Sequence, residues 1–294
     1  MIDSAGLSQL GRRLIDYGRL IRLHQPTGIW LLGWPALWAL WLASSGHPHE
    51  KIFTVFSLGV LVTRSAGCAL NDYADRTVDP YVKRTHDRPL AAGRITPPEA
   101  IGIYVTLSLA ALGLVCLLDQ LTIVYALVGA LLTAVYPFLK RVFSWPQAWL
   151  GVAFSWSIPM AFIAERQSVT PVAWVLFMAG VLWTLVYDTE YAMVDRDDDL
   201  KVGIKSTALL FGQADRLIIG ACQIGVVGLL AWVGILLQRG HWYALGLAAG
   251  ACLFYFQQTL LRHRERDACF RAFKNNAWFG AVIFIGIALD YLFI

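Results

Sequence analysis

Residues 71–90 read NDYADRTVDPYVKRTHDRPL and follow directly on an apolar stretch at residues 52–70. The segment opens with three aspartates and continues with three basic residues: Asp72, Asp75, Asp79, Lys83, Arg84 and Arg88. An apolar run that ends in dense charge is typical of a membrane-spanning helix that reaches the water interface. The segment therefore predicts the end of a membrane span, and its charges require an explanation.

The composition of the whole chain agrees with a membrane protein. Hydrophobic residues make up 57% of the 294 residues and charged residues only 15%, whereas soluble domains carry about 25% charged residues. The mean hydropathy is +0.57. These values predict an integral membrane protein.

Nine apolar windows have lengths close to the roughly 20 residues that a helix needs to cross a bilayer. They cover residues 28–44, 52–70, 101–118, 121–138, 147–164, 172–190, 217–237, 241–260 and 276–294. The windows do not alternate between polar and apolar residues, as the strands of a membrane β-barrel do. The sequence therefore predicts an all-α, polytopic membrane protein with nine transmembrane helices in a bundle.

The first 27 residues form a polar lead before the first window, without an A-x-A cleavage site, which favours a retained helix over a signal peptide. Apolar residues recur in the lead at helical spacing, with arginines between them: Leu7, Leu10, Leu14, Tyr17 and Ile21, and Arg12, Arg13, Arg19 and Arg22. This pattern predicts an amphipathic helix on the cytoplasmic leaflet. A frayed polar tail is the alternative.

The basic residues indicate the orientation of the chain. With the N-terminus inside, 20 of the 24 lysines and arginines fall on cytoplasmic segments, and only Lys51, Arg166 and Arg239 fall outside. Basic residues concentrate on the cytoplasmic side of membrane proteins, so we expect a cytoplasmic N-terminus and a periplasmic C-terminus. The net charge of +4 then reflects topology, and no basic and aromatic interleaving indicates a nucleic-acid partner.

Acidic residues gather in two places on the same predicted side. One group follows the second window within residues 72–87, and the other follows the sixth within residues 188–199. Asp75 and Asp195 lie 120 residues and four helices apart, and each group runs on into a basic segment, VKRT or VGIKST. The pattern indicates a four-helix pseudo-repeat in which each half carries one acidic motif.

The spacing within the motifs indicates a metal and phosphate site. Asn71, Asp75 and Asp79 are spaced by four residues, as are Asp195 and Asp199, so each set lines one face of a continuing helix. Mg²⁺ takes such oxygen ligands together with substrate phosphates. Basic residues near both motifs are candidates for the phosphate oxygens: Lys83, Arg84, Arg88, Arg141, Lys201 and Lys205. The alternative, two solvated loops with surface ion pairs of about 0–1 kcal/mol, does not explain the duplicated spacing.

Arg64 lies inside the second apolar window, where an unpaired charge costs a few kcal/mol. Residues 64, 68, 71 and 75 share one helical face, which directs Arg64 toward the same site; snorkelling or a local salt bridge is the alternative. The five cysteines form no C-x-x-C pair, and the six histidines stand apart from other metal-type ligands. A zinc site is therefore not expected.

Two segments resemble the UbiA superfamily of intramembrane aromatic prenyltransferases: NDYADRTVD with VKRTHDRPLAAG, and YDTEYAMVDRDDDLKVGIKSTALLFG. The resemblance also covers HQPTGIWLLGWPALWALW, VYPFLKR, SWSIPMAF and RERDACFRAFKNN, and so most of the chain. It is strongest to the bacterial 4-hydroxybenzoate polyprenyltransferases of ubiquinone biosynthesis.

The resemblance implies a prenyltransferase domain over residues 28–294, with helices around a lipid-accessible cavity. It further implies Mg²⁺ and polyprenyl diphosphate bound by two motifs, and transfer of the polyprenyl group to C3 of 4-hydroxybenzoate. The first motif falls on Asn71, Asp72, Asp75 and Asp79, and the second on Asp195 and Asp199. Asp75, Asp79, Asp195 and Asp199 are then the metal ligands and catalytic residues. DRDDD offers more than one register, so the roles of Asp188 and Asp198 stay open, as does the pairing of Arg141 with the acceptor carboxylate or diphosphate.

Two other functions compete with this one. A sister prenyltransferase would use 1,4-dihydroxy-2-naphthoate or homogentisate as its acceptor. A cation-coupled transporter would hold its ion near the bilayer midplane, whereas these acids cluster at one interface. The lead lacks the Arg- and Ser-rich pattern of a transit peptide, which favours a bacterial inner membrane. No feature of the sequence indicates an obligate protein partner.

Overall fold

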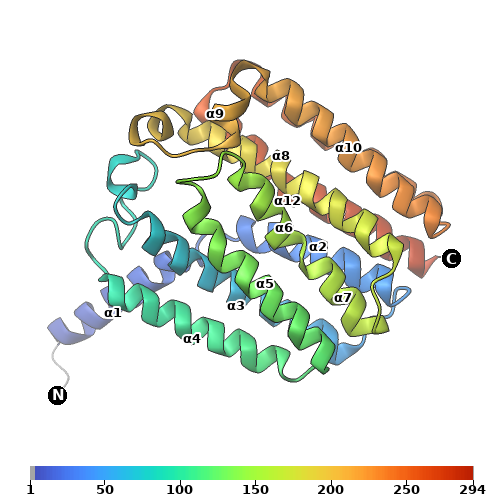
Figure 1. Cartoon of the computed structure of the whole chain (residues 1–294), viewed down its shortest axis with the longest axis horizontal. Coiled ribbons are helices and arrows are strands. Elements are labelled where there is room, and N and C mark those ends of the chain that lie inside the picture. The colour runs from blue at the N-terminus through green and yellow to red at the C-terminus, as the bar shows by residue number, and fades with distance from the viewer. Residues whose placement is uncertain (1–3, 294) are drawn as a thin grey trace.

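The computed structural model describes the backbone of residues 4–293 and the side chains of residues 11–293. Within this range the chain folds into helices without strands, packed side by side in one bundle (Figure 1). The elements are α1 (Ser4–Leu20), α2 (Thr27–Ala43), α3 (Glu50–Asp75), η1 (Asp79–Tyr81), α4 (Pro97–Val115), α5 (Gln120–Leu139), α6 (Pro146–Ser155), α7 (Ser157–Arg166), α8 (Pro171–Val202), α9 (Thr207–Phe211), η2 (Gly212–Ala214), α10 (Asp215–Leu236), α11 (His241–Leu260), η3 (Leu261–His263) and α12 (Arg266–Leu292). The all-α prediction is confirmed.

Eight helical segments of the described chain are long and apolar enough to cross a membrane, one fewer than the nine predicted windows. The remaining window, residues 28–44, forms α2, which is apolar but has only 17 residues. At 1.5 Å per residue, such a helix spans about 26 Å, slightly less than the hydrocarbon core. The chain is a multi-pass membrane protein whose first apolar helix is shorter than each of the eight candidate spans.

Local signals explain where the helices around the acidic motifs begin and end. A capping box starts α4, in which the Thr96 amide donates to Glu99 Oε2 at 2.8 Å, satisfying a free helix-end donor. Gly203 ends α8 with a φ of 73°, in the left-handed region where glycine has no steric penalty. Because α8 continues to this point, the second acidic motif lies in its last turns.

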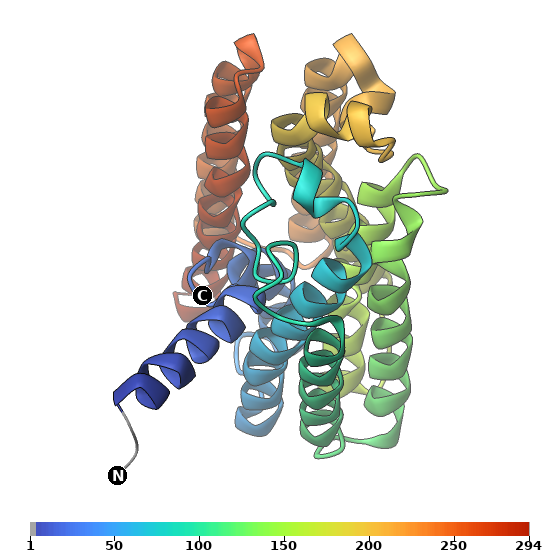
Figure 2. The same ribbon diagram turned by 90° about the vertical axis from the view of Figure 1, so that its left-hand side faces the viewer.

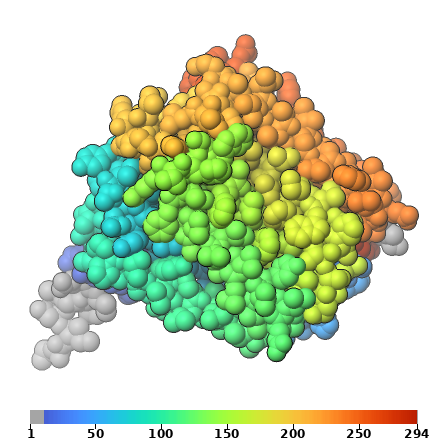
Figure 3. Space-filling model, viewed as in Figure 1, coloured from blue at the N-terminus to red at the C-terminus, as the bar shows by residue number. Residues whose placement is uncertain are grey.

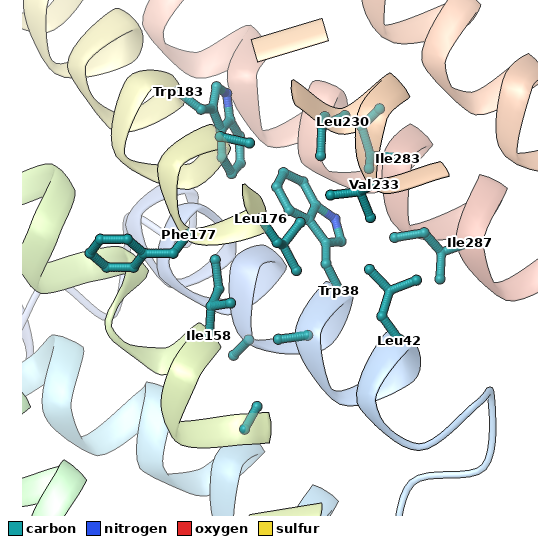
Figure 4. Packing of buried hydrophobic residues seen from close by; sticks show 14 of the residues in the cluster. Trp38, Leu42, Ile158, Leu176, Phe177, Trp183, Leu230, Val233, Ile283 and Ile287 are labelled. Carbon is teal, nitrogen blue, oxygen red and sulfur yellow. The ribbon is translucent and has the colours of Figure 1, made fainter. Parts of the chain in front are cut away.

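The centre of the bundle is an aromatic and aliphatic core between α2, α7, α8, α10 and α12 (Figure 4). Trp38 and Trp183 stack with ring centroids 4.9 Å apart, and Trp38 Nε1 donates to the Gly280 carbonyl at 3.0 Å. Lipid tails are as apolar as these side chains, so close packing and such polar contacts hold the helices together.

The N-terminal helix α1 runs outward from the bundle beside the loop of residues 76–96 (Figure 2). Ion pairs attach it: Arg13 Nη1 lies 2.8 Å from Glu99 Oε1, and Arg94 Nε lies 3.0 Å from Asp16 Oδ1. Of the predicted apolar stripe, Leu14 is 60% exposed, while the side chains of Leu7 and Leu10 lie outside the described residues. The helix is confirmed, and its contact with lipid stays a prediction.

Helices α11 and α12 approach each other most closely at Gly246 and Gly286. A Cβ at Gly246 would lie 2.9 Å from the Val282 carbonyl oxygen and 3.0 Å from the Gly286 Cα. Both atoms belong to backbone, which cannot move aside as a side-chain tip can. Small residues at such crossings let membrane helices pack backbone to backbone.

Gly246→Leu is therefore expected to lower the stability of the purified protein by about 1–3 kcal/mol, the usual effect of overpacking. Gly113→Leu is the matched control, because a Cβ there meets no atom within 4 Å. Melting temperatures in one detergent provide the measurement. Equal melting temperatures for the two variants would show that this crossing is looser than described.

Candidate active site

A cavity of about 1020 Å³ opens at the end of the bundle where both acidic motifs lie. The loop of residues 76–96 (cyan) and the segment around α9 (gold) meet at this end (Figures 1 and 3). Nine of the residues predicted for the site line the cavity: Arg64, Asn71, Asp75, Asp79, Arg84, Arg88, Asp195, Asp199 and Lys205. The fold thus brings together two motifs that are 120 residues apart in sequence.

The first motif spans a helix end rather than one continuous helix. Asn71 and Asp75 lie one turn apart on α3, which ends at Asp75, and Asn71 Nδ2 donates to Asp75 Oδ2 at 3.0 Å. Asp79 belongs to the 3₁₀ turn η1, and its carbonyl accepts from Thr85 Oγ1 at 3.0 Å. The predicted ladder with a spacing of four therefore holds for Asn71 and Asp75, while the loop positions Asp79.

Lys140 neutralises the first motif from the end of α5. Its Nζ lies 3.0 Å from Asp75 Oδ2 and 3.0 Å from Asn71 Oδ1. The neighbouring Arg141, which was predicted for the site, does not line the cavity, and its Nη2 donates to the Ala74 carbonyl at 2.6 Å. Successive residues at a helix end point about 100° apart. Lys140 therefore enters the site, whereas Arg141, the next residue, contacts the end of α3.

Asp72 lies outside the cavity lining and holds two arginines. Its Oδ1 lies 2.6 Å from Arg22 Nη2 and 3.1 Å from Arg88 Nη1, and Arg88 Nη1 also lies 2.8 Å from Asp79 Oδ2. Burial would lower the pKa of Arg22, but the Asp72 carboxylate raises it above its ordinary value. Burial raises the pKa of Asp79, and Arg88 only partly opposes that rise. A further positive charge near Asp79 would therefore be stabilising.

The second motif lies on one face of α8, with Asp195 and Asp199 in successive turns. Arg84 forms a fork with Asp195, from Nε to Oδ1 at 3.1 Å and to Oδ2 at 2.9 Å, and lies 4.4 Å from the Tyr191 ring centroid. Burial would lower the pKa of Arg84, yet the phenol of Tyr191 and the carboxylate of Asp195 raise it. Arg84 thus joins the loop after the first motif to the second motif.

The structure also distinguishes between the registers of DRDDD. Asp195 and Asp199 line the cavity, whereas Asp197 and Asp198 pair with Arg266 at 3.4 and 2.9 Å on the outer side of α8. Asp188 lines the cavity as well. The spacing D-x-x-x-D at residues 195–199 is therefore the one that faces the cavity.

Two of the predicted lysines lie away from the cavity, and a third has a structural contact. Lys83 and Lys201 are exposed and do not line it. Lys205 lies at the rim, where its Nζ donates to the Val142 carbonyl at 3.0 Å. The positive lining of the cavity therefore comes mainly from partly buried arginines and from Lys140.

Arg64 lines the cavity on α3, as its helical face predicted. It lies eleven residues before Asp75, about 16 Å deeper along the helix. Gly28 makes room for it, because a Cβ there would lie 2.4 Å from Arg64 Nε. Within the described residues its guanidinium contacts the Cys68 sulfur and no carboxylate.

The donor set suits Mg²⁺, although the acids are not gathered into a cage. The described residues contain no group of three His, Cys, Asp or Glu side chains close enough to hold a metal together. However, Mg²⁺ usually takes one or two carboxylates and completes its shell with water and substrate phosphates. Four carboxylates that face one cavity from α3, η1 and α8 fit that pattern, with Arg and Lys beside them for the remaining phosphate oxygens.

A family model described as the UbiA prenyltransferase family matches residues 32–284, most of the chain. The chain belongs to this family. The 4-hydroxybenzoate octaprenyltransferase of Chromohalobacter salexigens is 57% identical over 98% of this chain and 96% of its own length. The protein of the same name from Coxiella burnetii is 53% identical over 96% of this chain and 98% of its own length.

Solved structures of UbiA homologues share the fold. The apo homologue from Aeropyrum pernix K1 has a TM-score of 0.78 at 22% identity, over 90% of this chain and 97% of its own. The homologue from Archaeoglobus fulgidus bound to DMAPP and Mg²⁺ has a TM-score of 0.74 at 16% identity, over 94% and 99% of the two chains. The all-α bundle is therefore the UbiA fold.

Sequence reasoning missed three members of this UbiA-family site: Lys140, Arg22 and Tyr191. Lys140 was assigned only to membrane topology, and Arg22 to the surface helix. A signal for Lys140 was present, since it directly follows an apolar window at the same end as both motifs. Arg22 and Tyr191 gave no signal of their own, because their contacts depend on how distant segments pack.

The register of the second motif can be tested by making the same Asp→Asn change at two neighbouring positions, Asp199 and Asp198. Asp199→Asn removes a carboxylate from the cavity and should lower prenyl-transfer turnover by about 100-fold or more, as for a lost transition-state contact. Asp198→Asn weakens a contact with Arg266 on the side of α8 that does not line the cavity and should keep most of the turnover. Initial rates of the two purified variants provide the measurement, and a larger loss in Asp198→Asn would reverse the register.

Proposed function

We propose that the protein transfers a polyprenyl group from polyprenyl diphosphate to C3 of 4-hydroxybenzoate, releasing diphosphate, in ubiquinone biosynthesis. The observation that carries this proposal is the cavity itself, in which acids from two distant motifs and three cations, two from the loop of residues 76–96 and one from the end of α5, surround one mouth. The names of the relatives that are more than 50% identical support the choice of acceptor.

The mouth of the cavity is the proposed diphosphate site. Asp75, Asp79, Asp195 and Asp199 would hold Mg²⁺, which when bound supplies positive charge to the leaving diphosphate. Lys140, Arg88 and Arg84 now neutralise the first three of these acids. With these acids on Mg²⁺, the three cations would be available for phosphate oxygens. Asn71 orients Asp75, and Asp72 keeps Arg22 and Arg88 in place.

The walls below the mouth suit the rest of the reaction. Apolar side chains of α4 and α5, including Leu109, Leu112 and Leu127, line the cavity and can receive the prenyl chain from the membrane. Tyr191 and Phe273 also line it, and their rings stack 4.4 Å apart. Aromatic faces attract cations, so these rings are placed to stabilise the allyl cation while the ring of the acceptor attacks it.

Arg64 is the residue that we assign to the carboxylate of 4-hydroxybenzoate. It is a cation deep in the cavity, and the described residues offer it no carboxylate partner. A partly buried guanidinium without an anion is costly within a membrane helix bundle, and the acceptor supplies an anion. Arg141, the other candidate, is engaged with the Ala74 carbonyl.

The charged residues at the mouth of the cavity indicate how the protein is oriented in the membrane. We place the acidic mouth at the cytoplasmic face of the bacterial inner membrane, with a cytoplasmic N-terminus and a periplasmic C-terminus. The concentration of lysine and arginine at this end supports the orientation. Residues 28–294 then form the catalytic unit, and residues 1–27 lie on the cytoplasmic leaflet beside it.

The first test removes charge from each motif. Asp75→Asn or Asp195→Asn should lower Mg²⁺-dependent product formation by at least about 100-fold, while the protein still inserts and folds. Labelled 4-hydroxybenzoate and polyprenyl diphosphate, with and without Mg²⁺, provide the assay. Asp87→Asn is the matched control, because that side chain is 85% exposed and pairs only with His86. Near wild-type turnover in either motif variant would contradict the proposed site.

The second test concerns the acceptor. Arg64→Met should raise KM for 4-hydroxybenzoate by about 10- to 100-fold, as expected for losing a charge-assisted hydrogen bond of about 1.5–3 kcal/mol. KM for polyprenyl diphosphate should stay unchanged. The wild-type protein should prefer 4-hydroxybenzoate over 1,4-dihydroxy-2-naphthoate and homogentisate in parallel assays. Preference for another acceptor would overturn the substrate assignment but leave prenyl transfer intact.

A further inference from the structure

Asp188 is a cavity residue that the diphosphate site does not use. It lies on α8 seven residues before Asp195, and seven residues make almost two turns. It therefore shares the face of Asp195 and lies about 10 Å deeper in the bundle. The side chain is 9% exposed and lines the same cavity as both motifs.

The carboxylate of Asp188 has no cation paired with it in the protein. Within the described residues no ion pair reaches it, and its hydrogen-bond contact is with the neutral phenol of Tyr136. By contrast, Asp75, Asp79 and Asp195 each face a cation, and Glu190 accepts from Asn276 Nδ2 at 2.8 Å. A buried carboxylate without a paired cation is costly at this depth, and one phenol hydrogen bond does not offset that cost. Its partner is therefore expected among the molecules that enter the cavity.

The proposed reaction requires a base at this level. When C3 of the acceptor bonds to the prenyl carbon, its hydrogen must leave as a proton to restore the aromatic ring. The motif carboxylates at the mouth hold metal or cations, and Glu190 does not line the cavity. Asp188 is then the cavity carboxylate left for the proton, beside Tyr187, whose buried hydroxyl has no hydrogen-bond partner.

We propose that Asp188 is the general base that takes the proton from C3 of the acceptor, an inference that rests on the proposed prenyl transfer. The allylic C–O bond breaks, and its electron pair leaves with diphosphate. A π pair of the ring forms the new C–C bond, and the C3–H pair returns to the ring as the proton moves to the Asp188 carboxylate. Asp188 then passes the proton to water at the cytoplasmic mouth after the product leaves, so no other reactant is needed.

Ring deuteration tests this role directly. Wild-type enzyme should convert ordinary 4-hydroxybenzoate and the form deuterated at C3 and C5 at equal rates, because a positioned base makes proton removal fast. Asp188→Asn should lower kcat by about 100-fold or more, in the range for a lost general base. The deuterated acceptor should also react more slowly than the ordinary one in this variant. KM for polyprenyl diphosphate and the Mg²⁺ dependence should not change.

Asp197→Asn is the matched control, since it makes the same change on the outer face of α8 and should show wild-type rates with both acceptors. If Asp188→Asn does not fold, Asp188→Glu serves instead, because a displaced carboxylate should also expose the isotope effect. A wild-type rate in Asp188→Asn would overturn the role of Asp188. So would a loss of rate in Asp188→Asn in which the deuterated and the ordinary acceptor react in the same ratio as with the wild-type enzyme. Wild-type enzyme that forms no prenylated 4-hydroxybenzoate would instead overturn the proposed function.

Discussion

Pairing of carboxylates with cations across the mouth of the cavity is the constraint on which the site depends. The acids of α3, η1 and α8 lie at the end of a membrane bundle, where unpaired buried charge is costly. Each of Asp75, Asp79 and Asp195 meets a cation, namely Lys140 at the end of α5 and Arg88 and Arg84 in the loop of residues 76–96. These pairs tie α5 and the loop of residues 76–96 to the two motifs.

In the function proposed above, the same pairing would prepare the site for a diphosphate. Lysine and arginine that now neutralise carboxylates have the chemistry that phosphate oxygens require, and the carboxylates have the chemistry that Mg²⁺ requires. Substrate and metal can therefore enter together by exchange of partners, without leaving charge unpaired. The raised pKa of Asp79 shows that Arg88 alone does not compensate for its burial, so additional positive charge would be favourable there.

Much of this fold and site could be predicted from sequence because membrane helices leave long apolar runs and the motifs repeat at helical spacing. The cavity face of Arg64, Asn71 and Asp75 followed from the period of α3 alone. The helical period did not predict the position of Asp79, because α3 ends at Asp75 and the loop positions the residues that follow. It also could not choose Lys140 over Arg141, since that choice depends on how the end of α5 is rotated against α3. Arg22 reaches Asp72 only through the packing of α1, which leaves no periodic signal.

The most direct measurement is the position of the metal in a crystal structure with Mn²⁺ and an unreactive prenyl diphosphate analogue, located by anomalous scattering. The partner exchange predicts metal between the acids of the first motif and those of α8, with Lys140, Arg84 and Arg88 turned to phosphate oxygens. Metal bound away from these acids would contradict it. So would a bound diphosphate that leaves the Lys140–Asp75 and Arg84–Asp195 pairs unchanged.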